Sequence, residues 1–148
     1  EIAENAETTR IQEQHVEQAR TKLEQERVEE GMRELTVHGR LALLAVIAKA
    51  AADETPCRNR ELYEEYQRLC EQAGTDPLVQ RSVHNHLSDL RMFGILSAKE
   101  NRSGSRGNYY SYELNVPFES AVEAMSDVLH LEAEITQIKK RAAHNKVR

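Results

Sequence analysis

The 148-residue sequence has few aromatic side chains, few prolines and few cysteines. Aromatic residues make up 5% of the chain, and tryptophan is absent. Three prolines and two cysteines are too few for a collagen-like chain or a scaffold of disulfide bonds. Charged residues make up 30%. These proportions are typical of a helix-rich protein with one domain and an extension.

Long apolar runs are missing too. No stretch approaches the roughly 18–20 apolar residues that a membrane-spanning helix needs. The opening EIAENAETTR has neither a basic segment nor an apolar core, so we expect no signal peptide. The chain begins with Glu1 rather than Met, and we expect that it comes from a longer protein. These features predict a cytoplasmic protein with free thiols at Cys57 and Cys70.

Catalytic signatures are also absent from the sequence. It contains no GxxxxGK[ST], GxSxG or HExxH motif. His84 and His86 face different ways on the helix expected there, and no cysteine pair completes a zinc site. The sequence therefore predicts no catalytic activity, no metal site and no cofactor in this chain.

The charges are unevenly distributed. The net charge of −5 argues against a generally basic nucleic-acid-binding protein. Residues 1–34, however, hold 10 acids and 5 bases, whereas residues 76–116 hold 4 acids and 5 bases. The acidity lies in the N-terminal arm, and the slightly basic segment 76–116 is the one to search for a site.

Helical periodicity begins after a polar arm. Residues 1–12 lack a clear period, and we expect them to be disordered. Residues 15–35 predict a helix with a thin apolar stripe that must dock on a neighbour. Thr36 is a suitable cap for the next segment, HGRLALLAVIAKAAAD. That segment is apolar on most sides, which predicts a buried central helix.

Two further helices are expected. Asn59 opens NRELYEEYQRLCEQA, and Gly74 ends it. Asp76 and Pro77 should begin the next helix, because proline loses no hydrogen bond at the first helical position. The apolar face that we expect to seal the core consists of Val79, Val83, Leu87 and Leu90.

After Gly94 the period changes from helical to alternating. ILSAKE and NYYSYELNV predict two short strands, joined by the basic loop NRSGSRG. Alternation places Tyr110 and Tyr112 in the core, so only Tyr109 is a candidate for stacking on a base. One last helix should start at Phe118, with apolar residues at heptad-like spacing.

This order of elements predicts a mostly α fold, the winged helix-turn-helix. It comprises three helices and a β-hairpin wing, with an N-terminal helical extension and a C-terminal helix. We expect a polar arm and helix at residues 1–35, the winged-helix domain at 36–130, and a C-terminal helix extension with a basic tail at 131–148.

The outward face of the helix after Pro77 is polar. It carries Arg81, His84, Asn85 and Ser88. Arginine can donate two hydrogen bonds to a guanine edge, and asparagine can pair with adenine in the same way. In helix-turn-helix proteins the N-terminal part of the second helix enters the major groove. Many soluble domains have such a face, so it does not define a DNA site by itself.

The expected wing adds a second basic element. Its small residues allow close approach to a sugar-phosphate backbone, and its arginines suit a narrow minor groove. Each phosphate that it neutralises adds affinity and salt dependence. The residues concerned are Lys99, Arg102, Ser103, Gly104, Ser105, Arg106 and Gly107.

Two stretches carry a resemblance, EQHVEQARTKLEQERVEEGMRELTVHGRLALLAVIAKA and ELYEEYQRLCEQAGTDPLVQRSVHNHLSDLRMFGIL. The first resembles the junction of ATPase lid and winged helix in archaeal replication initiators. These are the homologues of origin recognition complex subunit one and cell division control protein six. The second stretch is similar to that family's helix-turn-helix. The resemblance covers roughly residues 13–130.

The resemblance implies a longer, nucleoid-associated protein with an AAA+ ATPase that binds ATP and magnesium, whose lid ends within residues 1–35. It implies binding to double-stranded origin DNA, with the recognition helix in the major groove. The replicative helicase and other initiator subunits are the further partners implied. The matched recognition positions are Gln80, Arg81, His84, Asn85 and Ser88, and the matched wing positions are Arg102, Ser103, Ser105 and Arg106.

Two other functions stay open at this point. A winged-helix transcription regulator would dimerise through the heptad-like apolar positions between Phe118 and Ile138. A winged-helix protein-interaction module of the replication machinery would bind no DNA, which suits the net negative charge.

Overall fold

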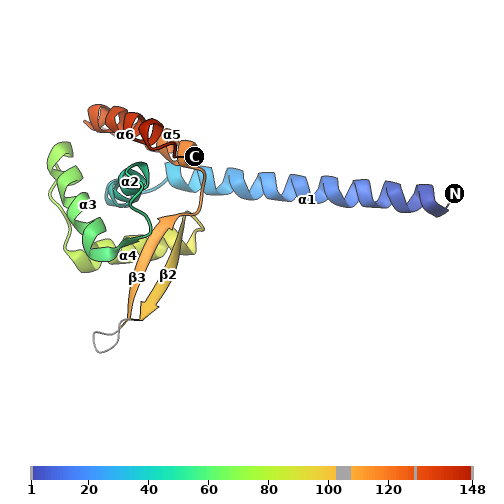
Figure 1. Cartoon of the computed structure of the whole chain (residues 1–148), viewed down its shortest axis with the longest axis horizontal. Helices are drawn as coiled ribbons and strands as arrows, with labels where there is room; N and C mark the ends of the chain where they lie inside the picture. The colour runs from blue at the N-terminus through green and yellow to red at the C-terminus, as the bar shows by residue number, and fades with distance from the viewer. Residues whose placement is uncertain (1, 103–107, 129, 148) are drawn as a thin grey trace.

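The computed structural model describes residues 2–102, 108–128 and 130–147 (Figure 1). Its packed helices, with a small antiparallel sheet at one side, confirm the predicted mostly α winged helix-turn-helix. None of the helices in these ranges is long and apolar enough to cross a membrane. The elements in chain order are α1 (Ile2–Arg33), α2 (Val37–Ala51), β1 (Cys57–Arg58), α3 (Asn59–Ala73), α4 (Gln80–Met92), β2 (Leu96–Arg102), β3 (Asn108–Leu114), α5 (Phe118–Ala124) and α6 (Glu132–His144).

The helix α2 is the centre of the core. Leu41, Leu44 and Ile47 are fully buried, and α3, α4, α5 and α6 all pack against it. The Thr36 hydroxyl accepts a hydrogen bond from the Gly39 N–H at 3.2 Å, so the predicted cap is confirmed. A helix that is apolar all round is stable only when other elements surround it, which explains this central position.

The helix α4 starts at Gln80, so its predicted start at Pro77 is wrong. The Tyr63 hydroxyl donates a hydrogen bond to the Leu78 carbonyl at 2.7 Å. The Tyr66 hydroxyl accepts one from the Leu78 N–H at 2.9 Å. Both backbone polar groups of Leu78 therefore bond to α3 side chains and not to a helical turn. These contacts between distant parts of the chain delay the helix beyond the proline.

The apolar face of α4 is confirmed at Val83, Leu87 and Leu90, which are all buried. Val79 is the exception, with 68% of its surface exposed. It precedes the first turn and has extended backbone, with ψ 157°. Helical spacing does not apply to such a residue, so its predicted place in the core is wrong.

The sheet has three strands in the order β1-β3-β2, all antiparallel. The sequence predicts only the hairpin of β2 and β3. The strand β1 was missed because two residues are too few for alternation to show. Cys57 pairs with Tyr112, and Arg58 pairs with Ser111. Tyr112 is buried and Tyr110 packs against the core as predicted, and central β3 buries Ser111 as well.

The predicted single C-terminal helix is two helices. α5 ends at Ala124 and α6 begins at Glu132. Between them His130 has φ 67°, a left-handed conformation that no continuous helix contains. Ile135 and Ile138 are buried, and α6 packs on α2. The apolar stripe that suggested a dimer is therefore used within the chain.

The helix α1 extends from the domain as a long rod (Figure 1). It is helical from Ile2, so the expected disorder is wrong for residues 2–12. The Ala-, Glu- and Gln-rich sequence favours helix even where no apolar period is visible. Near its C-terminal end Met32 is fully buried, whereas Ile11, Val16 and Leu23 are each more than half exposed.

Arg40 holds the joint between α1 and α2. Its Nε donates a hydrogen bond to the Leu35 carbonyl at 3.2 Å, and a terminal nitrogen donates to the Arg33 carbonyl. Its other terminal nitrogen pairs with Asp127 Oδ1 at 3.0 Å. Asp127 lies between α5 and α6. One planar guanidinium therefore links the end of α1 to the segment between α5 and α6, beside the buried Met32.

Candidate nucleic-acid interface

The front half of α4 presents free polar side chains. Gln80, Arg81 and Asn85 are exposed, and they form no hydrogen bond or ion pair with the residues that the structure describes. Arg81 and Asn85 are four residues apart, so they lie on one face of the helix. The opposite face is fixed in the core through Leu87 and Leu90. The helix thus holds its free donors and acceptors on a rigid support.

His84 lies beside this group but has a partner. It is half-buried, and its Nδ1 is 2.8 Å from the Nδ2 of Asn59, the first residue of α3. The Oδ1 of the same Asn59 amide is buried without a hydrogen-bond partner. An unpaired buried acceptor of this kind costs about 1–3 kcal/mol. Asn59 was read from the sequence only as a helix start, because its contact with His84 is a contact between helices.

The rear half of α4 faces the wing. Ser88, predicted on the free outward face, is half-buried. Burial raises the pKa of Tyr112, and hydrogen bonding with Ser88 and the charge of Arg91 oppose that rise. The Arg91 guanidinium carbon also lies 5.3 Å from the centre of the Tyr110 ring, within cation–π range. The strand β3 therefore occupies the rear part of the outward face.

The wing strands β2 and β3 pair along their whole length, from Leu96↔Leu114 to Arg102↔Asn108. The hairpin projects from the domain on the side of α2 where α4 lies (Figure 1). Lys99 is exposed on β2, and Arg102 ends that strand. The other predicted wing residues, Ser103, Ser105 and Arg106, lie outside the described residues.

Arg58 is a basic residue that the sequence reasoning missed. Its guanidinium carbon lies 4.1 Å from the centre of the Tyr109 ring, and its Nη2 donates a hydrogen bond to the Tyr109 hydroxyl at 2.8 Å. One face of Tyr109, the candidate for stacking on a base, is therefore covered. Arg60, two residues later, is exposed and lies 3.9 Å from Glu64. The paired arginines of CRNRE were the available signal.

The two cysteines are buried free thiols, as predicted. Burial raises the pKa of the Cys57 thiol to about 12, and a hydrogen bond with Glu61 adds to the rise. Burial raises the pKa of Cys70 as well. Both sulfurs are therefore protonated near neutral pH and poor nucleophiles. Within the described ranges no three His, Cys, Asp or Glu side chains are placed to hold a metal ion.

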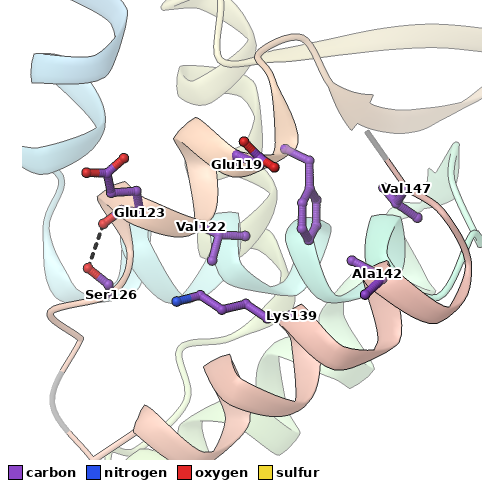
Figure 2. A pocket seen from close by; sticks show the side chains of 9 residues that line it. Glu119, Val122, Glu123, Ser126, Lys139, Ala142 and Val147 are labelled. Atoms are coloured by element: carbon purple, nitrogen blue, oxygen red, sulfur yellow. Dashed lines mark hydrogen bonds between the residues drawn. The ribbon is translucent and has the colours of Figure 1, made fainter.

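An open groove lies between α5 and α6, and Figure 2 shows its lining. Its lining is mixed: Val122 and Ala142 are apolar, whereas Glu119, Glu123 and Lys139 carry charges, and the Lys139 side chain runs beneath Val122. None of the predicted DNA-binding residues lines this groove. It lies on the other side of α2 from α4 and the wing (Figure 1), so it is separate from the candidate interface.

The fold is that of a winged-helix domain in which the first turns of α4 are exposed. The chain belongs to the family described as "CDC6, C terminal winged helix domain", whose profile matches residues 30–124. It is 74% identical over 147 residues to "ORC1-type DNA replication protein 15" of Haloarcula marismortui. It is 65% identical over 149 residues to "ORC1-type DNA replication protein 10" of Halobacterium salinarum. Each alignment covers 99% of this chain and 36% of the relative.

Two solved structures share the fold. "Structure of the Aeropyrum pernix ORC1 protein in complex with DNA" gives a TM-score of 0.70 at 28% identity, covering 82% of this chain and 31% of that one. "Crystal structure of Cdc6p from Pyrobaculum aerophilum" gives a TM-score of 0.51 at 26% identity, and the match covers 81% of this chain and 27% of that one. The predicted membership of the archaeal replication initiator family is confirmed. The chain spans about a third of the length of the curated relatives.

Proposed function

We propose that this chain binds duplex DNA at replication origins, as the winged-helix part of an initiator. The observation that carries the proposal is the rigid front half of α4, where Gln80, Arg81 and Asn85 are exposed and have no side-chain partner in the described part of the chain. In helix-turn-helix proteins this part of the helix enters the major groove. The structural likeness to an ORC1 protein solved with DNA supports the same function.

Each part of the interface then has a role. Arg81 donates to a guanine edge and Asn85 pairs with adenine. The wing approaches the backbone or the minor groove, where cations neutralise phosphates and small side chains allow close contact. The wing residues of this proposal are Lys99, Arg102, Ser103, Ser105 and Arg106. Arg58 and Arg60 add positive charge beside α4, which offsets the net charge of −5 locally.

The functions of the whole protein are inferred from the resemblance to archaeal replication initiators. We infer that ATP and magnesium bind in the part of the initiator that this chain does not span. We also infer that the full protein works at the nucleoid with the replicative helicase or other initiator subunits. The division into 1–35, 36–130 and 131–148, with the first part from a lid, belongs to this proposal.

A protein-interaction module of the replication machinery is the second candidate. Met92 and Phe93, at the end of α4, have 82% and 64% of their surface exposed, and apolar side chains of this size suit a protein contact. The dimeric regulator has lost its support, because Ile135 and Ile138 are buried within the chain.

Binding to duplex DNA across a salt series tests the proposal. The probes are the origin repeats of the host and a scrambled duplex of the same composition. We expect affinity that exceeds the control and falls as salt rises, because phosphate contacts release counterions. If neither this chain nor the full-length protein binds DNA at low salt, the proposal is wrong and the protein-interaction function takes its place.

A further inference from the structure

Asn59 is held in place from two sides. The preceding residue, Arg58, pairs with Ser111 in the sheet, and Asn59 itself is the first residue of α3. Its backbone is therefore fixed by a strand and by a helix. From that position its side chain reaches across to α4, where Nδ2 lies 2.8 Å from Nδ1 of His84.

The amide of Asn59 faces His84 with its nitrogen. Nδ2 lies toward Nδ1 of His84, and Oδ1, on the other side of the amide, is buried without a partner among the described residues. An amide nitrogen donates hydrogen bonds and cannot accept them, so Nδ1 of His84 is the acceptor in this contact. The ring proton of neutral His84 is then on Nε2.

The Nε2–H of His84 is then available to a ligand. The only buried side-chain N or O atom without a partner in the described ranges is Oδ1 of Asn59, so Nε2 has access to solvent. It forms no hydrogen bond with another residue that the structure describes. His84 lies three residues from Arg81 and one from Asn85, at the edge of the free front half of α4.

We propose that Asn59 is a positioning residue for DNA recognition, which holds His84 so that its Nε2–H donates to N7 of a purine in the major groove. This inference rests on the proposed function and deepens it. On the major-groove edge both purines offer N7 as an acceptor and thymine offers O4, whereas cytosine offers a donor. A ring fixed as a donor therefore disfavours cytosine at one position, and removal of N7 alone distinguishes a contact with a purine from a contact with thymine. Asn59 acts only through His84 and does not itself touch the base.

The orientation is tested without DNA. Nitrogen NMR of labelled histidine, at a pH where the ring is neutral, distinguishes a protonated Nε2 from a protonated Nδ1. We expect His84 to carry its proton on Nε2 in the wild type and to become a mixture of the two tautomers in Asn59→Ala. The matched control is Asn145→Ala. It removes a different side-chain hydrogen bond, from Nδ2 of Asn145 to the Ala51 carbonyl at 2.9 Å, and should leave the tautomer of His84 unchanged. A wild-type proton on Nδ1 overturns the inference.

The contact with DNA is tested on a duplex that the wild type selects from a random pool. Each purine of that duplex is replaced in turn by its 7-deaza form, which lacks the N7 acceptor. We expect one position at which wild-type affinity falls about fivefold to tenfold, as for one lost hydrogen bond. The same replacement should have no effect on His84→Ala and little effect on Asn59→Ala.

A stability measurement separates positioning from a structural role. Asn59→Ala removes the unfavourable unpaired Oδ1 and, at the same time, the favourable hydrogen bond of Nδ2 to His84. We therefore expect the urea midpoint to stay unchanged. The base preference should fall about as much as it does in His84→Ala. A lowered midpoint with an unchanged preference overturns the inference. If the wild type prefers one duplex but no 7-deaza replacement lowers its affinity, the inference is overturned and the proposed function stays intact. No preferred duplex with either this chain or the full-length protein overturns both.

Discussion

The two halves of α4 share one helix and one polar face, yet they differ in what that face is free to do. In the front half Arg81 and Asn85 are exposed and have no partner among the described residues. In the rear half Ser88 and Arg91 interact with tyrosines of β3. Helical spacing decides which residues point outward, but tertiary packing decides which of these stay free. The structure therefore confines candidate base contacts to the first turns of α4.

Leu87→Ala should have the largest effect, because both halves of α4 depend on its anchoring. Leu87 is fully buried on the core face. Truncating such a residue removes apolar contacts and leaves a cavity, which costs about 2–5 kcal/mol of unfolding free energy. Urea unfolding followed by circular dichroism measures the loss. The control is Val79→Ala, at a 68% exposed site, which should change stability by less than about 0.5 kcal/mol. Equal effects would show that α4 is not anchored through this face.

The comparison is sharpest between Arg81→Ala and Arg91→Ala, which remove the same side chain from opposite halves. Arg81→Ala should lose about 1–3 kcal/mol of binding free energy and relax the preference at one base pair. Arg91→Ala should lose less and keep every preference, because its guanidinium packs on Tyr110. Fluorescence anisotropy on duplexes with single base-pair changes gives both quantities. The same loss of preference in both variants would contradict the distinction between the halves.

Substitutions in the wing should affect all DNA sequences alike. Arg102→Ala and Arg106→Ala each remove one cation, so we expect the slope of log affinity against log salt to fall by about 1 without a change in base preference. Salt titrations with a specific and a scrambled duplex measure this. Arg10→Ala, an exposed position on α1, is the control and should leave the slope unchanged. A loss restricted to one sequence would instead place a wing arginine on a base.

Ser88→Ala should have the smallest effect on DNA binding. Hydrogen bonding with Ser88 lowers the pKa of Tyr112, so its loss should raise that pKa further above the ordinary tyrosine value. Without this bond the buried phenolate is less stable, so the pKa of Tyr112 should rise and not fall. NMR titration of labelled tyrosine measures the change, and base preference should stay as in the wild type. If preference falls while the Tyr112 pKa stays constant, Ser88 faces the DNA and not the wing.

Local signals in the sequence predicted most of the fold. The cap at Thr36 and the stop at Gly74, which has φ 70°, depend on residues within one turn of the helix end. The central position of α2 follows from its apolar sequence alone. The alternation of β3 correctly predicted the burial of Tyr112. In each case the residues that decide the structure are neighbours along the chain.

The wrong predictions concern features that are determined by residues far apart in the sequence. The start of α4 depends on the hydroxyls of Tyr63 and Tyr66, which bond to Leu78 from another helix. The break at His130 has no glycine or proline to indicate it, and α6 gains its burial only by turning back onto α2.

The candidate site shows the same division. The outward placement of Arg81 and Asn85 was predictable from helical spacing. The engagement of Ser88 by β3 was not, and neither was the contact of Asn59 with His84, since both need the packed arrangement of the elements.

The joint held by Arg40 gives α1 the mechanics of a lever. With 32 residues at 1.5 Å rise each, the helix is about 48 Å long. A rotation of about 10° at the joint displaces the far end by about 8 Å at that length. The hydrogen bonds of one guanidinium to Leu35 and Asp127 are thus the pivot. A rotation at this joint therefore moves the tip of the rod much farther than it moves the residues that hold the joint.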